Sequence, residues 1–407
     1  KKPFDPSLFV TIRRRLGNAT FNEMTDALLE RVTEIEKITQ KARKGKSSQK
    51  SKPPKSTGEQ ENEPDNQSND DDKRSGMLLL DASVAPADIK YPTDLDLLNK
   101  SREHSERIID GLWQQLKTPG AVKPRTYCRL ARKDYLNMAK KRKKKPKELR
   151  KSIRKQLNYL NRNLNTINIL LDKFRSDRWP LNFYELRLFW IIQEVYRQQQ
   201  QMFAERTHKI SDRIVSVSQP HVRPIVRGKA GKDVEFGAKI SVSVVDGYAF
   251  LDRLSWDAYH EASDLPDQVE GYKKRFGYYP EVVITDGLYR TRKNRDWLRE
   301  KNIRLSGKPL GRPPKETEEN ALHLKAERKR RQKENGIRSR VEGKFGEGKH
   351  GYDLNLIKAK LPKTSESWIA AIFFVMNIAD LLRYYLFVPI WACLRKRLIR
   401  MFMHVKE

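Results

Sequence analysis

Apolar residues recur every three or four positions near the start of the chain, which is the spacing of one helix face. Two runs share this spacing on either side of a break at Gly17-Asn18: Phe9, Ile12 and Leu16, then Met24, Leu28 and Val32. We therefore predict a helical region over residues 1–41. Almost no apolar residue occurs in residues 42–76, where Lys, Ser, Glu, Asn and Asp dominate. This composition predicts a disordered linker, because it buries too little surface to offset the entropy lost on ordering.

The pattern changes again at Met77, which begins a short apolar segment that ends at Val84. Because the run is short and lies between a Gly and a Pro, it predicts a buried strand in a segment over residues 77–91. Residues 92–210 are predicted to be a helical insertion. Within it, a seam of apolar residues recurs at helical spacing: Leu149, Ile153, Leu157, Leu160, Leu164, Ile167 and Leu171. Trp179-Pro180 ends this seam, and a second helix is expected from 182 to 206. We interpret the pair as a helical hairpin that packs within one chain rather than as a dimeric coiled coil.

Residues 211–390 alternate between strand and helix patterns. Strands are predicted at 213–218, 236–245, 248–256 and 281–287, and helices at 265–276, 290–302, 337–348 and 365–386, with a basic loop and helix over 306–336. Asp246-Gly247 predicts a tight hairpin between two of these strands. Residues 391–407 form a basic tail.

The charge of the chain narrows the choice of partner. Among 407 residues, 84 Lys and Arg outnumber 52 Asp and Glu, so the net charge is +32. An excess of this size indicates a polyanion, most commonly nucleic acid. A membrane is not expected, because the apolar segment from Trp368 to Phe387 contains Asp380 and Arg383 and is better read as a buried helix. Two cysteines provide neither a disulfide framework nor a zinc site.

Three carboxylates occupy positions from which they could bind the same metal ions. Asp81 and Asp286 each lie at or near the end of a predicted buried strand, and Glu342 lies on a helix close to the C-terminus. Phosphoryl transfer on DNA requires an activated nucleophile and a neutralised leaving oxygen, and two metal ions can serve both. Mg²⁺ or Mn²⁺ prefers carboxylate oxygens. We therefore predict that Asp81, Asp286 and Glu342 hold two such ions.

The segments around these carboxylates resemble the DDE transposases of bacterial insertion sequences. Leu78-Leu79-Leu80-Asp81-Ala82-Ser83 is similar to the strand of that family's first Asp, and Val283-Ile284-Thr285-Asp286-Gly287-Leu288-Tyr289 to the strand of its second. Arg338-Ser339-Arg340-Val341-Glu342-Gly343-Lys344-Phe345 resembles the helix of the catalytic Glu. One branch of the family places a Tyr, an Arg, the Glu and a Lys in fixed order there. Arg338 and Lys349 match this order, whereas Asn335 occupies the Tyr position.

The resemblance implies a fold, a reaction and partners. The fold is α/β, with a ribonuclease-H-like catalytic core that a large helical insertion interrupts. The reaction is metal-dependent cleavage and strand transfer on double-stranded DNA, comprising the inverted repeats of the element and a target. Arg338 and Lys349 are implied to contact the transposon end. A homodimer in the DNA complex and a prokaryotic, nucleoid-associated cytoplasmic location are also implied.

The first metal ligand has competitors. More than a hundred residues separate Asp81 from the next predicted strand, whereas Asp212 and Asp246 lie nearer to Asp286 in sequence. The interval from Asp246 to Asp286 is too short for two strands and a helix, and Asp212 precedes its apolar run. We favour Asp81 and leave the two alternatives open.

Further DNA contacts are predicted from basic segments. The run Lys140, Lys141, Arg142 and Lys143 is either a phosphate-binding surface or a solvated face. Arg312, in a Gly-Arg-Pro-Pro sequence, is either a minor-groove arm or part of a plain loop. Residues 256–261, with a Trp, a Tyr and a Glu, either support the active site or close a strand-end turn. Residues 1–41 suit either DNA binding or dimerisation.

Three functions are compatible with these features. The first is an active transposase that binds the ends of its own element. The second is a decayed or domesticated DNA-binding protein, and the third is a metal-dependent nuclease without strand transfer. The retained carboxylates favour the first.

Overall fold

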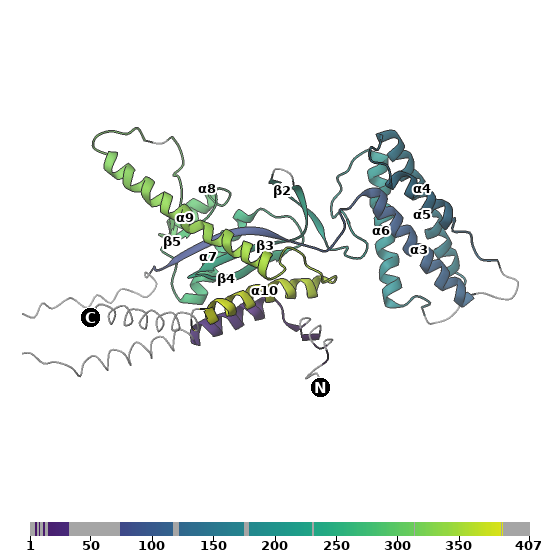
Figure 1. Cartoon of the computed structure of the whole chain (residues 1–407), viewed down its shortest axis with the longest axis horizontal. Coiled ribbons are helices and arrows are strands. Elements are labelled where there is room, and N and C mark those ends of the chain that lie inside the picture. The colour runs from purple at the N-terminus through teal and green to yellow at the C-terminus, as the bar shows by residue number, and fades with distance from the viewer. Residues whose placement is uncertain are drawn as a thin grey trace, which may run out of the picture. The chain divides into compact units, whose positions relative to one another are not determined.

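The computed structural model describes residues 5, 8, 11–12, 15–31, 74–116, 122–174, 179–229, 232–312, 314–383 and 385. The predicted linker lies outside these residues except for 74–76, and the basic tail lies outside them entirely. The chain divides into two compact units. One contains residues 1–86, 239–255 and 259–407, and the other contains residues 87–238 and 256–258. Each unit is described by itself (Figure 1).

The described chain is mixed α/β. Its strands are β1 (Met77–Pro86), β2 (Arg223–Lys229), β3 (Lys232–Val245), β4 (Tyr248–Ser255), β5 (Val282–Ile284) and β6 (Arg304–Leu305). Its helices are α3 (Asp94–Leu116), α4 (Cys128–Ala139), α5 (Pro146–Leu171), α6 (Phe183–Glu205), η2 (Glu261–Asp264), α7 (Leu265–Phe276), α8 (Arg292–Glu300), α9 (Ala321–Gly351) and α10 (Pro362–Leu382). Residues 18–31 are also helical.

The strands form one sheet in the order β2-β3-β1-β5-β6, and β4 pairs with β3. Pairing is parallel between β1 and β5 and between β5 and β6, and antiparallel between β3 and β4. Asp246 and Gly247 both have positive φ, 49° and 94°, in the turn between β3 and β4. These values suit the two-residue turn of a twisted hairpin, so the predicted hairpin is confirmed.

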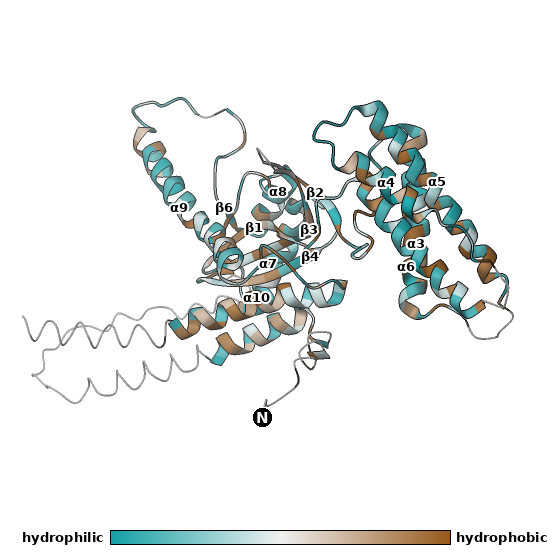
Figure 2. Ribbon diagram, turned by 45° about the vertical axis from the view of Figure 1, so that its right-hand side comes forward, coloured by the Kyte–Doolittle hydropathy of each residue, from teal (hydrophilic) through white to brown (hydrophobic). Residues whose placement is uncertain are grey.

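Helices cover the sheet of the first unit according to the alternation of side chains along β1. Leu78 and Leu80 are buried with Val269 of α7 and Leu298 of α8 in one apolar cluster. The opposite face of β1 carries Ser83, which Lys349 of α9 contacts. The sheet therefore lies between α7 and α8 on one face and α9 on the other. The N-terminal half of α9 projects beyond the sheet and is hydrophilic (Figure 2).

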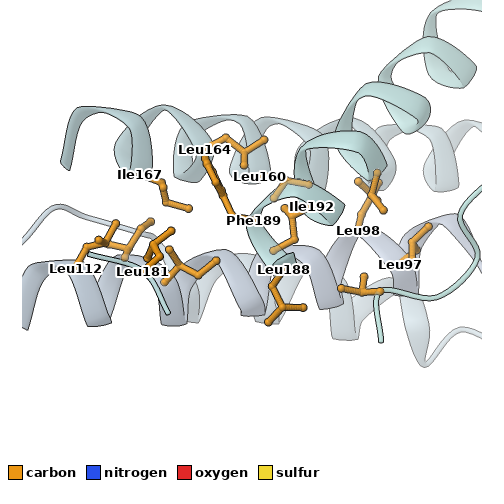
Figure 3. Close-up of a cluster of buried hydrophobic side chains, with 14 of the residues drawn as sticks. Leu97, Leu98, Leu112, Leu160, Leu164, Ile167, Leu181, Leu188, Phe189 and Ile192 are labelled. Atoms are coloured by element: carbon orange, nitrogen blue, oxygen red, sulfur yellow. The ribbon is translucent and has the colours of Figure 1, made fainter. Parts of the chain in front are cut away.

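The helical unit has a core of its own. Side chains of α3, α5 and α6 point toward one another, including Leu112, Leu160, Leu164 and Ile192 (Figure 3). The predicted seam over 149–171 is thus confirmed as intramolecular packing. A capping box starts α6: the Asn182 side chain accepts from the Glu185 backbone N–H at 2.9 Å, and Glu185 accepts from the Asn182 backbone N–H at 3.1 Å.

Two sequence expectations are wrong. Residues 213–218 form no strand. They form an irregular segment whose apolar side chains, among them Ile214 and Val217, are buried against the helical core. The helix expected to begin at 337 is the C-terminal part of one continuous helix, α9. Gly336 has no positive φ and does not break this helix.

Helix α10 is the only described helix that is long and apolar enough to cross a membrane. It packs on the protein, because Asn377 is 1% exposed and is hydrogen bonded to β4. The Ala249 N–H donates to Asn377 Oδ1 at 2.9 Å, and Asn377 Nδ2 donates to the Ala249 carbonyl at 2.8 Å. Phe374 also contacts Phe21 of helix 18–31, at 5.8 Å between ring centroids. The buried helix predicted around Trp368 is therefore observed.

Asn377→Ala should destabilise the first unit by about 2–4 kcal/mol, because both backbone groups of Ala249 would lose a buried partner. Chemical denaturation with a two-state fit measures the change. Val375 is 45% exposed on the same helix, so Val375→Ala is the control and should change stability by less than about 0.5 kcal/mol. Equal effects of the two substitutions would contradict this account of α10.

Candidate functional site

The parallel pairing of β1 and β5 brings two carboxylates together. The register pairs Leu79 with Ile284. Continued by two residues, it places Asp81 beside Asp286, and the two charges interact. Adjacent strands lie about 4.8 Å apart, and residues in register point to the same face. The strand pairing thus fixes Asp81 and Asp286 as neighbours although they are distant in sequence.

The environment of Asp81 opposes its negative charge. Burial raises its pKa to about 6, and the charges of Asp286 and Glu261 act in the same direction, while a hydrogen bond from the Ala82 N–H and the charge of Arg338 act against them. Among the described residues, no Lys or Arg nitrogen lies within 4.0 Å of either Asp carboxylate. The site therefore concentrates negative charge without a paired cation.

One oxygen of each Asp carboxylate accepts a hydrogen bond from a backbone N–H one or two residues later in the chain. Asp81 Oδ1 accepts from the Ala82 N–H at 2.8 Å, and Asp286 Oδ1 accepts from the Leu288 N–H at 2.9 Å. These bonds orient the side chains and leave the second oxygen of each without a hydrogen bond from the described part of the chain. Two such oxygens provide hard anionic donors of the kind that Mg²⁺ and Mn²⁺ prefer.

Helix α9, which carries Glu342, packs over the face of the sheet that carries Asp81. Lys349 Nζ donates to Ser83 Oγ at 3.0 Å, and Ser83 lies two residues after Asp81. Glu342 precedes Lys349 by two helical turns and so lies on the same side of α9. Its side chain is 53% exposed and pairs with Arg338 at 2.9 Å. Among the described residues, no three His, Cys, Asp or Glu side chains lie close enough to hold a metal ion.

Glu261 and Lys239 form a buried ion pair next to the carboxylates. Lys239 Nζ lies 2.8 Å from Glu261 Oε2, with side chains 15% and 14% exposed. Lys239 also donates to the Tyr259 carbonyl at 2.8 Å. The sequence had indicated residues 256–261, and Tyr259 and Glu261 do lie in this region. Trp256 instead packs on His221 in the helical unit, at 4.3 Å between ring centroids.

Lys239 was not recognised from the sequence. It is a single cation between Ala238 and Ile240, both fully buried, in the long strand β3. A charge flanked on both sides by buried apolar residues needs a partner, and this signal could have identified it.

Arg290 was also missed. Its guanidinium donates to the Thr285 carbonyl at 2.7 Å, directly before Asp286. Burial is the first cause that lowers its pKa, followed by the charge of Arg295, while Asp286 acts in the opposite direction. Arg290 is therefore a cation at the edge of the carboxylate site.

The alternatives for the first carboxylate lie elsewhere. Asp246 is exposed in the β3–β4 turn and influences Tyr272, whose hydroxyl contacts Ser75 at the start of β1. Asp212 is exposed in an irregular segment of the helical unit. Neither Asp lies on a strand next to β5.

The DNA contacts predicted from the basic segments are exposed, whereas Arg338 and Lys349 are half-buried. Lys140, Lys141, Arg142 and Lys143 occupy the end of α4 and the loop to α5, and Lys141 pairs with Glu148 at 2.7 Å. Arg312 is exposed in the loop before α9. These side chains are accessible to a polyanion, apart from the competing carboxylate at Lys141.

Residues 283–379 match the family model of the transposase DDE domain. The match begins within β5, ends within α10 and includes Asp286, Arg338, Glu342 and Lys349. It supports a DDE transposase, a class of DNA-cleaving and DNA-transferring enzymes that generally use divalent metal ions. No curated protein and no solved structure gives a significant match to the chain.

Asp81→Asn should stabilise the metal-free protein at neutral pH. The folded-state pKa of about 6 exceeds the ordinary value of 3.8, so the native state binds more protons, and stability falls as pH rises from about 4 to 6. Removing the charge should recover up to about 3 kcal/mol at pH 7. Denaturation in EDTA at pH 7 and pH 4 measures the gain, which should vanish at the lower pH. A stability loss at pH 7 would contradict the charge crowding.

Proposed function

We propose that this protein is a DNA transposase, which binds the ends of its own insertion element, cleaves them and joins the 3′-hydroxyls to target DNA. Two observations carry the proposal. The parallel pairing of β1 and β5 reaches Leu79 and Ile284, and Asp81 and Asp286 each follow two residues later. The transposase-domain match begins within β5. A ribonuclease-H-like core, completed by Glu342 on α9, is part of the same proposal.

Asp81, Asp286 and Glu342 would hold two Mg²⁺ or Mn²⁺ ions. The fit rests on the Asp pair, which has no Lys or Arg nitrogen within 4.0 Å among the described residues and presents one carboxylate oxygen of each Asp without a hydrogen bond from the described chain. When bound, such ions stabilise charge on the attacking and leaving oxygens of an in-line displacement. Glu342 must leave Arg338 to join the pair, and Arg338 is then available to a DNA phosphate.

Other parts of the chain bind and orient the DNA in this proposal. Lys349 and Arg338 lie on the side of α9 that faces β1 and would contact the transposon end. Arg312 and the run Lys140 to Lys143 would contact phosphates without reading sequence. A homodimer in the DNA complex, a role for residues 1–41 in DNA binding or dimerisation, and action in a prokaryotic cytoplasm complete the proposal.

A catalytically decayed or domesticated DNA-binding protein is the second candidate. The observation that favours it is Asn335, which replaces the Tyr of the related motif. A nuclease that shares the site but lacks strand transfer would be distinguished by supplying pre-cleaved ends.

Asp286→Asn and Glu342→Gln should each lower end cleavage and strand transfer in Mg²⁺ by several orders of magnitude, because each removes a charged ligand of the metal pair. DNA binding should survive, since the basic surfaces are unchanged. Cleavage and gel-shift assays on a duplex with the inverted repeats that flank the gene measure both properties.

Asp296→Asn is the matched control. Asp296 is 60% exposed on α8 and pairs with Arg299, so this variant should cleave normally. Near-normal cleavage by Asp286→Asn would place the chemistry elsewhere. DNA binding without cleavage by the unaltered protein, even in Mn²⁺, would favour the decayed protein.

The basic loop is tested by salt dependence. Replacing Lys140, Arg142 and Lys143 with Gln should flatten the plot of log affinity against log salt concentration by up to about three units, because each phosphate contact releases counterions. The control replaces Lys90, Lys100 and Arg107, three exposed cations elsewhere in the helical unit. Equal flattening by both triple variants would show an effect of bulk charge only.

A further inference from the structure

The guanidinium of Arg290 occupies a space that a glycine keeps open. A Cβ built on Gly307 would lie 2.1 Å from Arg290 Nη1 and 2.2 Å from Cζ. Gly307 also has a φ of +106°, which L side chains rarely adopt. Both the backbone conformation and the available space at Gly307 therefore depend on glycine, and Arg290 packs directly against it.

Arg290 is anchored on one side only. Its Nη2 donates to the Thr285 carbonyl at 2.7 Å. Its Nε is buried and has no hydrogen-bond partner in the structure as described. A guanidinium has five N–H donors in a planar fork, so most of the donor capacity of Arg290 is unused.

The charges around Arg290 also leave it unsatisfied. No carboxylate oxygen lies within 4.0 Å of it among the described residues, whereas two other arginines have such a partner: Arg338 pairs with Glu342 at 2.9 Å and Arg299 with Asp296 at 3.0 Å. The charges of Arg295 and Arg338 repel it, while those of Asp286 and Glu334 attract it from beyond ion-pair distance. A partly buried cation without a close ion pair is costly, and an anionic ligand in direct contact would reduce that cost.

We propose that Arg290 binds a nonbridging oxygen of a DNA phosphodiester at or next to the bond that is cleaved. The ligand class follows from the permanent positive charge of the guanidinium and its remaining N–H donors, which form charge-assisted hydrogen bonds with phosphate oxygens. Its location follows from the Thr285 carbonyl, which holds Arg290 one residue before Asp286. This inference rests on the proposed function and assigns a phosphate-positioning residue to that site.

A charge-deletion cycle tests the contact. The probe is an inverted-repeat duplex with a neutral methylphosphonate at the scissile linkage or at either flanking linkage. Its affinity is measured by fluorescence anisotropy in EDTA, so the result does not depend on metal or on catalysis. The unaltered protein should bind one of the three neutral duplexes at least about fivefold more weakly than the natural duplex. Arg290→Gln should bind that methylphosphonate duplex and the natural duplex with equal affinity.

Single-turnover kinetics in Mg²⁺ provide the second measurement. Arg290→Gln should lower the maximal cleavage rate by about 100-fold, with little change in the DNA concentration at half-maximal rate, because the group acts on one phosphate among many. Arg290→Met keeps the apolar stem and should behave alike if Gln impairs folding. Gly307→Ala should reproduce the loss without removing a charge. Arg299→Gln, with a side chain 78% exposed, is the control.

The outcomes separate the two proposals. If the unaltered protein neither binds the ends nor cleaves them, the proposed function fails. If it cleaves them, but Arg290→Gln and Arg290→Met keep the full preference for the natural linkage or lose affinity equally for all duplexes, Arg290 has a structural role and the inference is overturned.

Discussion

Two like charges on adjacent parallel strands are the constraint around which the first unit is arranged. Leu78, Leu80 and Val283 are buried on one face of β1 and β5, and Leu79, Val282 and Ile284 are buried on the other, so a change of register would disturb close packing on both faces. The register that satisfies the core therefore also sets Asp81 beside Asp286. Hydrophobic burial holds the carboxylates against their repulsion, and the crowding remains until a cation arrives.

The charges around the Asp pair and Arg290 are complementary to those of divalent ions and a DNA phosphate. Lys239 neutralises Glu261, and Lys344 pairs with Glu347 at 3.2 Å. Within the described chain, neither Asp carboxylate has a Lys or Arg nitrogen within 4.0 Å, and Arg290 has no carboxylate oxygen within 4.0 Å, although Asp286 and Arg290 influence one another at longer range. Divalent ions with a bound phosphodiester would satisfy both needs together. A protein that was only a DNA-binding scaffold would gain nothing from this unpaired arrangement, so the pattern favours a catalytic site.

The sequence predicted the strand-end carboxylates because short apolar runs and turn residues are local signals. It could not reveal that Arg290 packs against Gly307, because the two residues lie in different loops that only the folded chain brings together. The strand predicted at 213–218 failed for a related reason. Val215 and Val217 alternate with Ser216 and Ser218 as in a strand, but tertiary packing buries these apolar side chains without a neighbouring strand. Periodicity reports burial, and burial alone does not specify backbone pairing.

In the helical unit, the residues that form the core are different from those that carry the positive charge. Its core consists of α3, α5 and α6 side chains that contact one another. Residues 123–155, by contrast, contain sixteen Lys and Arg against two Asp and Glu, and most of these cations are exposed. Mutual repulsion among them destabilises the native unit, and the core does not need them. A surface that opposes folding is retained when a partner offsets the cost, and a polyanion such as duplex DNA does so by releasing its counterions.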